Sequence, residues 1–222
     1  MGNQSFVSDE TRDRLRGVAR PLALAFGRLG LTPNALTVIG FLGTCVAAVA
    51  AASQLWLAAG ILVIAFGIFD MFDGALARAT GKTSDFGAFL DSTLDRTGES
   101  LVLAGVAYGA ADAGYPLIAG LAGTAIAFAS VVTYARAKAE IFGLKGDVGI
   151  APRPERLVIL ALGLGLASLP WTAGENALLH VWARGSTWLA IALGLITILS
   201  AITVVQRILV VRRQLAANAS QR

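Results

Sequence analysis

The sequence predicts an all-α, polytopic membrane protein: six transmembrane helices preceded by an N-terminal amphipathic helix on the cytoplasmic side. Of its 222 residues, 56% are hydrophobic and only 14% are charged, whereas soluble proteins carry about 25% charged residues. Several apolar segments also reach about 20 residues, the length of helix that crosses roughly 30 Å of hydrocarbon. These two observations exclude an ordinary water-soluble domain.

Six segments are predicted to span the membrane, and the fifth is the shortest. They run from Asn34 to Ser53, Leu55 to Thr80, Phe86 to Ala111, Pro116 to Phe142, Pro154 to Leu169 and Thr187 to Val211. Thr32 followed by Pro33 suits the N-cap and first turn of the first span. The links are too short to fold separately, so we expect one helical membrane domain, residues 34–222.

Residues 1–33 form a juxtamembrane segment. Ser8 can cap a helix whose first turn is acidic, which matches the positive end of the helix dipole. Apolar residues then recur at helical spacing, with most arginines off that stripe: Leu15, Val18, Leu22, Ala25 and Leu29. We expect an amphipathic helix on the cytoplasmic leaflet, kinked near Pro21. A disordered basic tail is the alternative.

Positive charge is concentrated in every second connection. Lysine and arginine precede the first span, flank the second-to-third and fourth-to-fifth links and follow the last span, with Arg184 as the exception. All four tryptophans lie on the other side, where amphipathic rings favour the interface. By the positive-inside rule, both termini face the cytoplasm of a multi-pass cell-membrane protein. The net charge of +4 therefore reflects topology and not nucleic-acid binding.

The second and third spans carry an unusual group of carboxylates. Asp70 and Asp73 are three residues apart, and Asp91 and Asp95 are four apart, so each pair lies on one face of its helix. A short link, residues 81–84, joins the two spans on the cytoplasmic side. The two acidic faces are therefore expected to meet below the membrane surface.

Unpaired carboxylates at that depth are costly, because each ionised group costs about 2.5 to 3.5 kcal/mol on insertion scales. They could be protonated, paired with cations of the protein, or bound to metal ions in a wet cavity. Arg78 and Arg96 can each neutralise only one of them. Carboxylate oxygens suit hard cations, and we expect Mg²⁺ shared with phosphate, with Mn²⁺ or Ca²⁺ as alternatives.

These residues resemble a family signature. The pattern Asp70-x-x-Asp73-Gly74-x-x-Ala77-Arg78, eight residues, Gly87-x-x-x-Asp91-x-x-x-Asp95 is similar, without gap or substitution, to that of the CDP-alcohol phosphotransferases. That family also has six spans, with its motif in the second and third. The resemblance therefore extends over most of the chain.

The resemblance implies transfer of a substituted phosphate from a CDP-linked lipid to an alcohol, with release of CMP. One or two Mg²⁺ ions would be held by Asp70, Asp73, Asp91 and Asp95, and Asp95 would also be the base that takes the hydroxyl proton. The CDP-lipid would contact Asn34, Thr37, Asp70, Asp73, Gly74, Arg78 and Ser84. Asp85 lies outside the signature and is expected to cap a helix. Membership would further imply a homodimer.

A second group of basic residues indicates an anionic acceptor. They lie in residues 134–157, YARAKAEIFGLKGDVGIAPRPERL, and in the sixth span. Arg136 and Arg207 lie about one turn or more inside the ends of their predicted helices, where a charged side chain is costly and often has a functional role. The segment resembles the phosphatidylinositol phosphate synthases of the family. This likeness implies a CDP-linked lipid, CDP-diacylglycerol, as donor, with a lipid that carries archaeol chains as the alternative. It implies inositol 1-phosphate (1D-myo-inositol 3-phosphate) as acceptor, bound through Arg136, Lys138, Arg153, Arg156 and Arg207.

Two alternatives stay open. Glycerol 3-phosphate is also an anionic acceptor, and its use would make the protein a phosphatidylglycerophosphate synthase. Buried carboxylates also line ion pathways, so a cation transporter is the alternative of another class. A transport path would place carboxylates through both leaflets, whereas the strong candidates here lie toward the cytoplasm. The leading interpretation is therefore an enzyme whose active site faces the cytoplasm.

Overall fold

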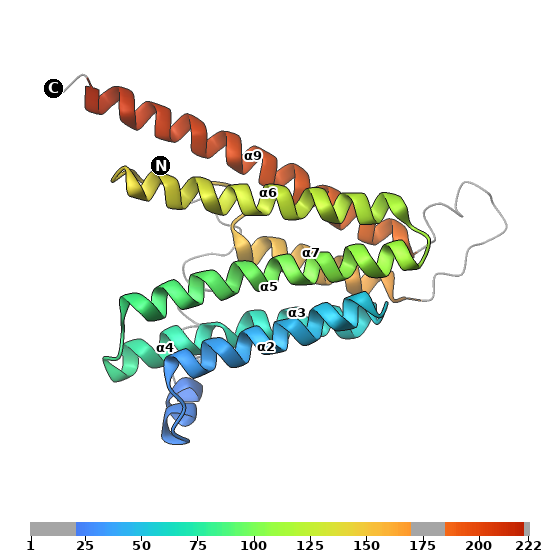
Figure 1. The fold of residues 1–222 in the computed structure, drawn as a ribbon, viewed down its shortest axis with the longest axis horizontal. Helices are drawn as coiled ribbons and strands as arrows, with labels where there is room; N and C mark the ends of the chain where they lie inside the picture. The colour runs from blue at the N-terminus through green and yellow to red at the C-terminus, as the bar shows by residue number, and fades with distance from the viewer. Residues whose placement is uncertain (1–20, 170–184, 220–222) are drawn as a thin grey trace.

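The computed structural model describes residues 21–169 and 185–219, and the regular structure in these ranges is helical. The helices are α2 (Pro33–Ala52), α3 (Trp56–Phe69), α4 (Met71–Thr80), α5 (Asp85–Asp112), α6 (Pro116–Ile141), α7 (Arg153–Ala167) and α9 (Gly185–Ala219). Residues 21–28 form a further helical segment. Figure 1 shows the long helices lying side by side in one bundle. The predicted all-α class is confirmed.

Four segments of the described chain are long and apolar enough to cross a membrane: α2, residues 56–80 (α3 and α4 together), α6 and α9. Helix α5 is 28 residues long but carries the carboxylates, and α7 has only 15 residues. Two of the six predicted spans are therefore absent from these four: α5 because its carboxylates lower its hydropathy, and α7 because it is short. A membrane protein with several spanning helices is what the structure supports.

The second predicted span is broken into two helices. Helix α3 ends at Phe69 and α4 begins at Met71, with Asp70 between them. No proline interrupts the segment, so periodicity alone predicted one continuous helix. Helix α9 also extends to Ala219 and not to Val211, because its polar continuation still consists mostly of good helix formers.

The ends of the helices follow local sequence signals. The Thr32 hydroxyl oxygen accepts a hydrogen bond from the Ala35 amide at 3.2 Å, and Pro33 occupies the first turn of α2, as predicted. Helix α4 ends at Gly81, which has a φ of 65°, a left-handed conformation that glycine adopts without strain. The predicted link between the two acidic helices is therefore confirmed.

Close packing holds α2 against α5 in the core. A Cβ atom on Gly105 would collide with the backbone carbonyl of Ala48, and one on Gly109 with that of Ala51. Such glycines let two helix backbones approach each other in a membrane. Around this contact, buried alanine, leucine and valine side chains of α2, α3, α5, α6, α7 and α9 form one cluster. This core therefore fixes α5, which carries Asp91 and Asp95, against α2, and a second cluster packs Ala75 and Leu76 of α4 against Leu36 of α2.

The predicted N-terminal amphipathic helix lies mostly outside the described residues, Ser8 included. In the part that is described, Ala23 is buried with Leu36, Ala75 and Leu76. This segment therefore packs against α2 and α4, and whether it lies on a membrane stays a prediction.

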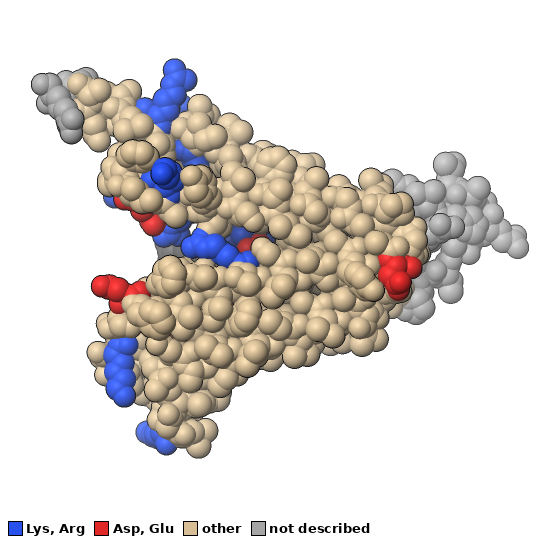
Figure 2. Space-filling model, viewed as in Figure 1, with Lys and Arg blue, Asp and Glu red and all other residues tan. Residues whose placement is uncertain are grey.

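Charged side chains gather mainly at the end of the bundle where α4 meets α5, whereas the middle of the visible surface is almost free of them (Figure 2).

Candidate active site

Two of the cavities at the charged end of the bundle share Asp91 in their linings. The first, of about 220 Å³, lies between the start of α2, helix α4, the link and the start of α5. The second, of about 400 Å³, lies between α5, α6, the start of α7 and Arg207 of α9. In Figure 2 acidic and basic side chains are visible in a recess at this end. The acidic group of α5 therefore separates two spaces.

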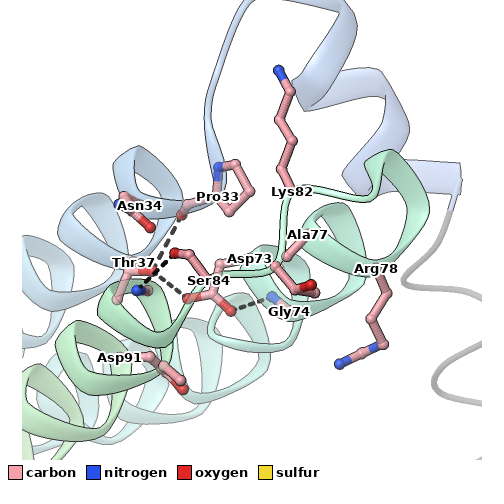
Figure 3. Close-up of a pocket in the computed structure, with 13 residues that line it drawn as sticks. Pro33, Asn34, Thr37, Asp73, Gly74, Ala77, Arg78, Lys82, Ser84 and Asp91 are labelled. Atoms are coloured by element: carbon pink, nitrogen blue, oxygen red, sulfur yellow. Dashed lines mark hydrogen bonds between the residues drawn. The ribbon is translucent and has the colours of Figure 1, made fainter.

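The first cavity brings together most of the residues predicted to contact the CDP-lipid. Its lining includes Asn34, Thr37, Asp73, Gly74, Arg78 and Ser84; Asp70 is the predicted contact that does not line it. Figure 3 shows Thr37, Asp73 and Ser84 close to one another, with Asp91 on the neighbouring helix. The lining also includes Lys82 and Thr83. Sequence reasoning used Lys82 only for topology, although its place in so short a link beside the signature was a usable signal.

Asp73 is held in place by α2. Only 6% of the residue is exposed, and its carboxylate accepts hydrogen bonds from the Thr37 hydroxyl at 2.6 Å and from the Gly74 amide. A Cβ atom on Gly74 would lie 3.2 Å from Nη1 of Arg78, tighter than an ordinary contact. The glycine thus leaves room for the guanidinium beside the cavity, where a planar cation suits a phosphate group.

The prediction that Asp85 caps α5 was wrong. Ser84 is the N-cap, and its hydroxyl oxygen accepts a hydrogen bond from the Gly87 amide at 3.0 Å. Serine is as good an N-cap as aspartate, and here it comes one residue earlier. Asp85 lies in the first turn, where a negative charge is favourable, and it lines neither cavity.

Arg153, the first residue of α7, bridges two of the four predicted metal ligands. Its Nη2 lies 3.0 Å from Oδ2 of Asp70, and its Nη1 lies 2.5 Å from Oδ2 of Asp95. Of the three ways to tolerate these carboxylates, pairing with a cation of the protein is therefore present for two of them. The sequence pointed to Arg78 and Arg96 for this pairing and to Arg153 for the acceptor.

The carboxylates suit a divalent cation by their chemistry. They supply only oxygen donors, which Mg²⁺ and Mn²⁺ prefer. Asp73 and Asp91 line the same cavity, and a guanidinium already lies between Asp70 and Asp95. As the side chains stand, no three histidine, cysteine or acidic residues of the described ranges are arranged to hold an ion. The metal ligands therefore remain a prediction, and Arg153 occupies one carboxylate oxygen of Asp70 and one of Asp95.

The second cavity contains four of the five residues predicted to bind the acceptor phosphate: Arg136, Arg153, Arg156 and Arg207. Lys138 does not line it, and its Nζ lies 5.9 Å from the centre of the Phe142 ring. Arg136 is exposed and pairs with Glu140 at 2.9 Å. Carboxylates line the same space, with Asp95 among them.

Arg156 is already fully engaged within the protein. Its Nε and Nη2 bind the two carboxylate oxygens of Glu99 at 2.7 and 2.8 Å, and its Nη1 donates to the Ala151 carbonyl at 2.8 Å. Sequence reasoning missed Glu99. The signal was available, because Glu99 follows Asp95 by four residues, as Asp95 follows Asp91, and so shares their helix face.

Arg207 is likewise buried, with 6% of the residue exposed. Its Nε donates to the Val148 carbonyl at 2.9 Å, and its Nη1 donates to the Val132 carbonyl. This arginine therefore joins α9 to α6 and to the loop that follows α6. The charge that the sequence placed inside the sixth span has a structural reason, in addition to its place in the cavity lining.

Comparison with known proteins gives consistent results at three levels. A family model described as CDP-alcohol phosphatidyltransferase matches residues 30–196. The phosphatidylinositol phosphate synthase of Mycolicibacterium smegmatis is 38% identical over 199 residues, covering 85% of this chain and 84% of that protein. The archaetidylinositol phosphate synthase of Pyrococcus horikoshii is 39% identical over 163 residues, covering 70% of this chain and 79% of that protein.

Solved structures agree with the sequence relatives. The crystal structure of Mycobacterium tuberculosis phosphatidylinositol phosphate synthase with CDP-DAG bound superposes with a TM-score of 0.77 at 31% identity, covering 87% of this chain and 93% of that one. A structure of the same enzyme in complex with manganese and citrate gives a TM-score of 0.75 at 31% identity, covering 87% and 88%.

Proposed function

Because this chain belongs to the CDP-alcohol phosphatidyltransferase family, we propose that it makes phosphatidylinositol phosphate. It transfers a phosphatidyl group from CDP-diacylglycerol to inositol 1-phosphate (1D-myo-inositol 3-phosphate) and releases CMP. The relatives named phosphatidylinositol phosphate synthase and the related structure with CDP-DAG bound support this choice. Membership of an enzyme family also argues against a cation transporter.

The observation that carries the proposal is the pair of cavities that meet at Asp91. The first cavity offers Gly74, Arg78 and Lys82 to a diphosphate, and the second is lined by arginines suited to an acceptor phosphate. A lipid donor in the first and an alcohol phosphate in the second would face each other across the acidic group.

In the reaction, an acceptor hydroxyl oxygen forms a bond to the lipid-side phosphorus, and the bond from that phosphorus to the CMP oxygen breaks. Asp95 lines the second cavity, where its carboxylate would take the hydroxyl proton. Arg78 would hold the diphosphate of the bound lipid and then the phosphate of the departing CMP, while Arg136 and Arg153 would hold the acceptor phosphate. A bound Mg²⁺ or Mn²⁺, held by Asp70, Asp73, Asp91 and Asp95, would supply neutralisation of phosphate charge; a related structure contains manganese.

The proposal includes a topology. The six spans would be α2, α3 with α4, α5, α6, α7 and α9, with both termini and the site on the cytoplasmic side of the cell membrane. The support is the alternation of basic and tryptophan-bearing connections. The N-terminal segment would lie on the same leaflet as an amphipathic helix. A homodimer is part of the proposal, because family membership implies one.

CMP release tests this function. The purified protein is given CDP-diacylglycerol and Mg²⁺ with one of four additions: inositol phosphate, glycerol 3-phosphate, free inositol or no acceptor. We expect release of CMP with inositol phosphate and little with the other three. Equal or faster release with glycerol 3-phosphate would instead identify a phosphatidylglycerophosphate synthase.

A further inference from the structure

The loop between α6 and α7, residues 142–152, leads directly to Arg153, which lines the second cavity. It runs back from the end of α6 to the start of α7 in the middle of the bundle (Figure 1). Pro152 and Arg153, at the point where the loop joins α7, line that cavity. The position of the loop therefore determines where the Arg153 guanidinium lies.

The loop does not hold itself in place through its own backbone. After the turn in which the Leu144 amide binds the Ala139 carbonyl, the next backbone to backbone hydrogen bond in this described stretch joins Arg156 to Pro152. A segment without a hydrogen-bond ladder needs other partners for its polar groups, or it loses order. The partners here come from α9.

Three side chains of α9 bind the loop at three points. The Gln214 amide group both accepts from the Lys145 amide at 3.0 Å and donates to the Lys145 carbonyl at 2.9 Å. Arg207 donates to the Val148 carbonyl at 2.9 Å. The Thr203 hydroxyl oxygen accepts from the Ala151 amide at 3.2 Å.

The spacing shows that these contacts form one continuous strip. Thr203, Arg207 and Gln214 span eleven residues, or about 16 Å of helix at 1.5 Å per residue. The bound loop residues, 145 to 151, can cover about 20 Å when extended. The order of contacts is reversed along the two segments, so the loop runs antiparallel to α9.

Packing fits this arrangement. Thr203 and Ala151 are completely buried. Gly149 has a φ of 143°, and a Cβ atom on it would collide with the Thr203 side chain, so only glycine allows the loop to approach α9 this closely. The Ala151 carbonyl also accepts from Arg156, which extends the connection from Thr203 into the second cavity.

We propose that Thr203 and Gln214 are positioning residues of the acceptor site, which hold the α6–α7 loop along α9 so that Arg153 faces the second cavity. Neither residue lines either cavity, so both act through the loop. The inference rests on the proposed function only in taking the second cavity as the acceptor site. Loss of either contact weakens acceptor binding and leaves CDP-lipid binding intact, because the first cavity contains no residue of this loop.

The test uses four variants. Thr203→Val and Gln214→Ala remove the loop contacts, and Thr203→Ser keeps a hydroxyl at the same position. Thr197→Val is the matched control, because both Thr197 and Thr203 donate to a carbonyl of their own helix at 2.9 and 2.8 Å, but only Thr203 is bonded to the loop. The thermal unfolding midpoint of each variant shows that it folds.

Steady-state CMP release then gives the KM for inositol phosphate and for CDP-diacylglycerol. Thr203→Val loses one hydrogen bond to the loop and is expected to raise the acceptor KM by about two- to tenfold. Gln214→Ala loses two and is expected to raise it by at least as much. The lipid KM stays unchanged, and Thr203→Ser and Thr197→Val behave as the parent protein. An unchanged acceptor KM in both loop-contact variants, or an equal rise in both KM values, overturns the proposal.

Hydrogen exchange separates this inference from the proposed function. The Lys145 and Ala151 amides should exchange faster in Gln214→Ala and Thr203→Val, respectively, than in the parent protein and in Thr197→Val. A parent protein that releases no CMP with inositol phosphate refutes the proposed function, and exchange still decides the role of the loop contacts. Unchanged exchange at both amides shows that α9 does not hold the loop.

Discussion

The buried ion pair of Glu99 and Arg156 gives the sharpest stability prediction. Only 8% of the Glu99 side chain and 3% of the Arg156 side chain are exposed, and the pair is bidentate, with bonds of 2.7 and 2.8 Å. Glu99→Leu leaves the Arg156 charge buried without its main partner. Removing one partner of a buried pair costs about 3–5 kcal/mol. For a chain of this size that lowers Tm by about 6–20 °C, at roughly 2–4 °C per kcal/mol.

Thermal unfolding of the detergent-solubilised protein, followed by tryptophan fluorescence, measures this loss. A second variant that combines Glu99→Leu with Arg156→Met should recover most of it, because replacing both charges with apolar groups is often neutral. Glu140→Gln is the control, since it breaks a pair with Arg136 that is more than half exposed and should cost at most about 1 kcal/mol. A single variant as stable as the parent, or a double variant less stable than the single one, would refute the reasoning.

Three further predictions concern the reaction, the metal and the packing. Asp95→Asn should slow turnover at least about 100-fold, as expected for a lost general base, while Asp85→Asn should not. Retained activity in Asp95→Asn would show that Asp95 is not the base. Arg153→Gln should tighten Mn²⁺ binding, measured by electron paramagnetic resonance without substrates, by about ten- to hundredfold, because a hydrogen bond to a charged group is worth about 1.5–3 kcal/mol. Weaker binding would show that Arg153 does not compete with the ion. Gly105→Val should destabilise the protein by about 1–3 kcal/mol through overpacking. Gly120→Ala should not, because there is open space around Gly120. Equal Tm values for the two variants would contradict the close contact of α2 and α5.

Local signals in the sequence were enough to place most of the helices. Hydrophobic length and the Thr32 cap located α2 to within a residue at each end. The four-residue spacing predicted that Asp91 and Asp95 share a face of one helix, and both line the second cavity. These features depend on residues close together in the chain, where helix geometry alone determines what is adjacent.

The side-chain partners could not be predicted in the same way. Arg153 binds Asp70 across 83 positions of sequence, and Arg156 binds Glu99 across 57. Which arginine meets which carboxylate depends on how α7 packs against the other helices. The break at Asp70 was also missed, because no proline or helix-terminating glycine marks it. The charge pattern therefore predicted that arginines lie near the site, and only the fold shows which carboxylate each arginine binds.

The central claim is that one centre joins a CDP-lipid to inositol phosphate, and the most direct test is the product balance. Liposomes containing the protein and CDP-diacylglycerol are incubated with Mg²⁺ and inositol phosphate, and both products are quantified by mass spectrometry. We expect phosphatidylinositol phosphate and CMP in equal amounts, with neither formed when the divalent ion is removed by a chelator. CMP without the new lipid, or an equal yield of both in the chelator, would contradict it.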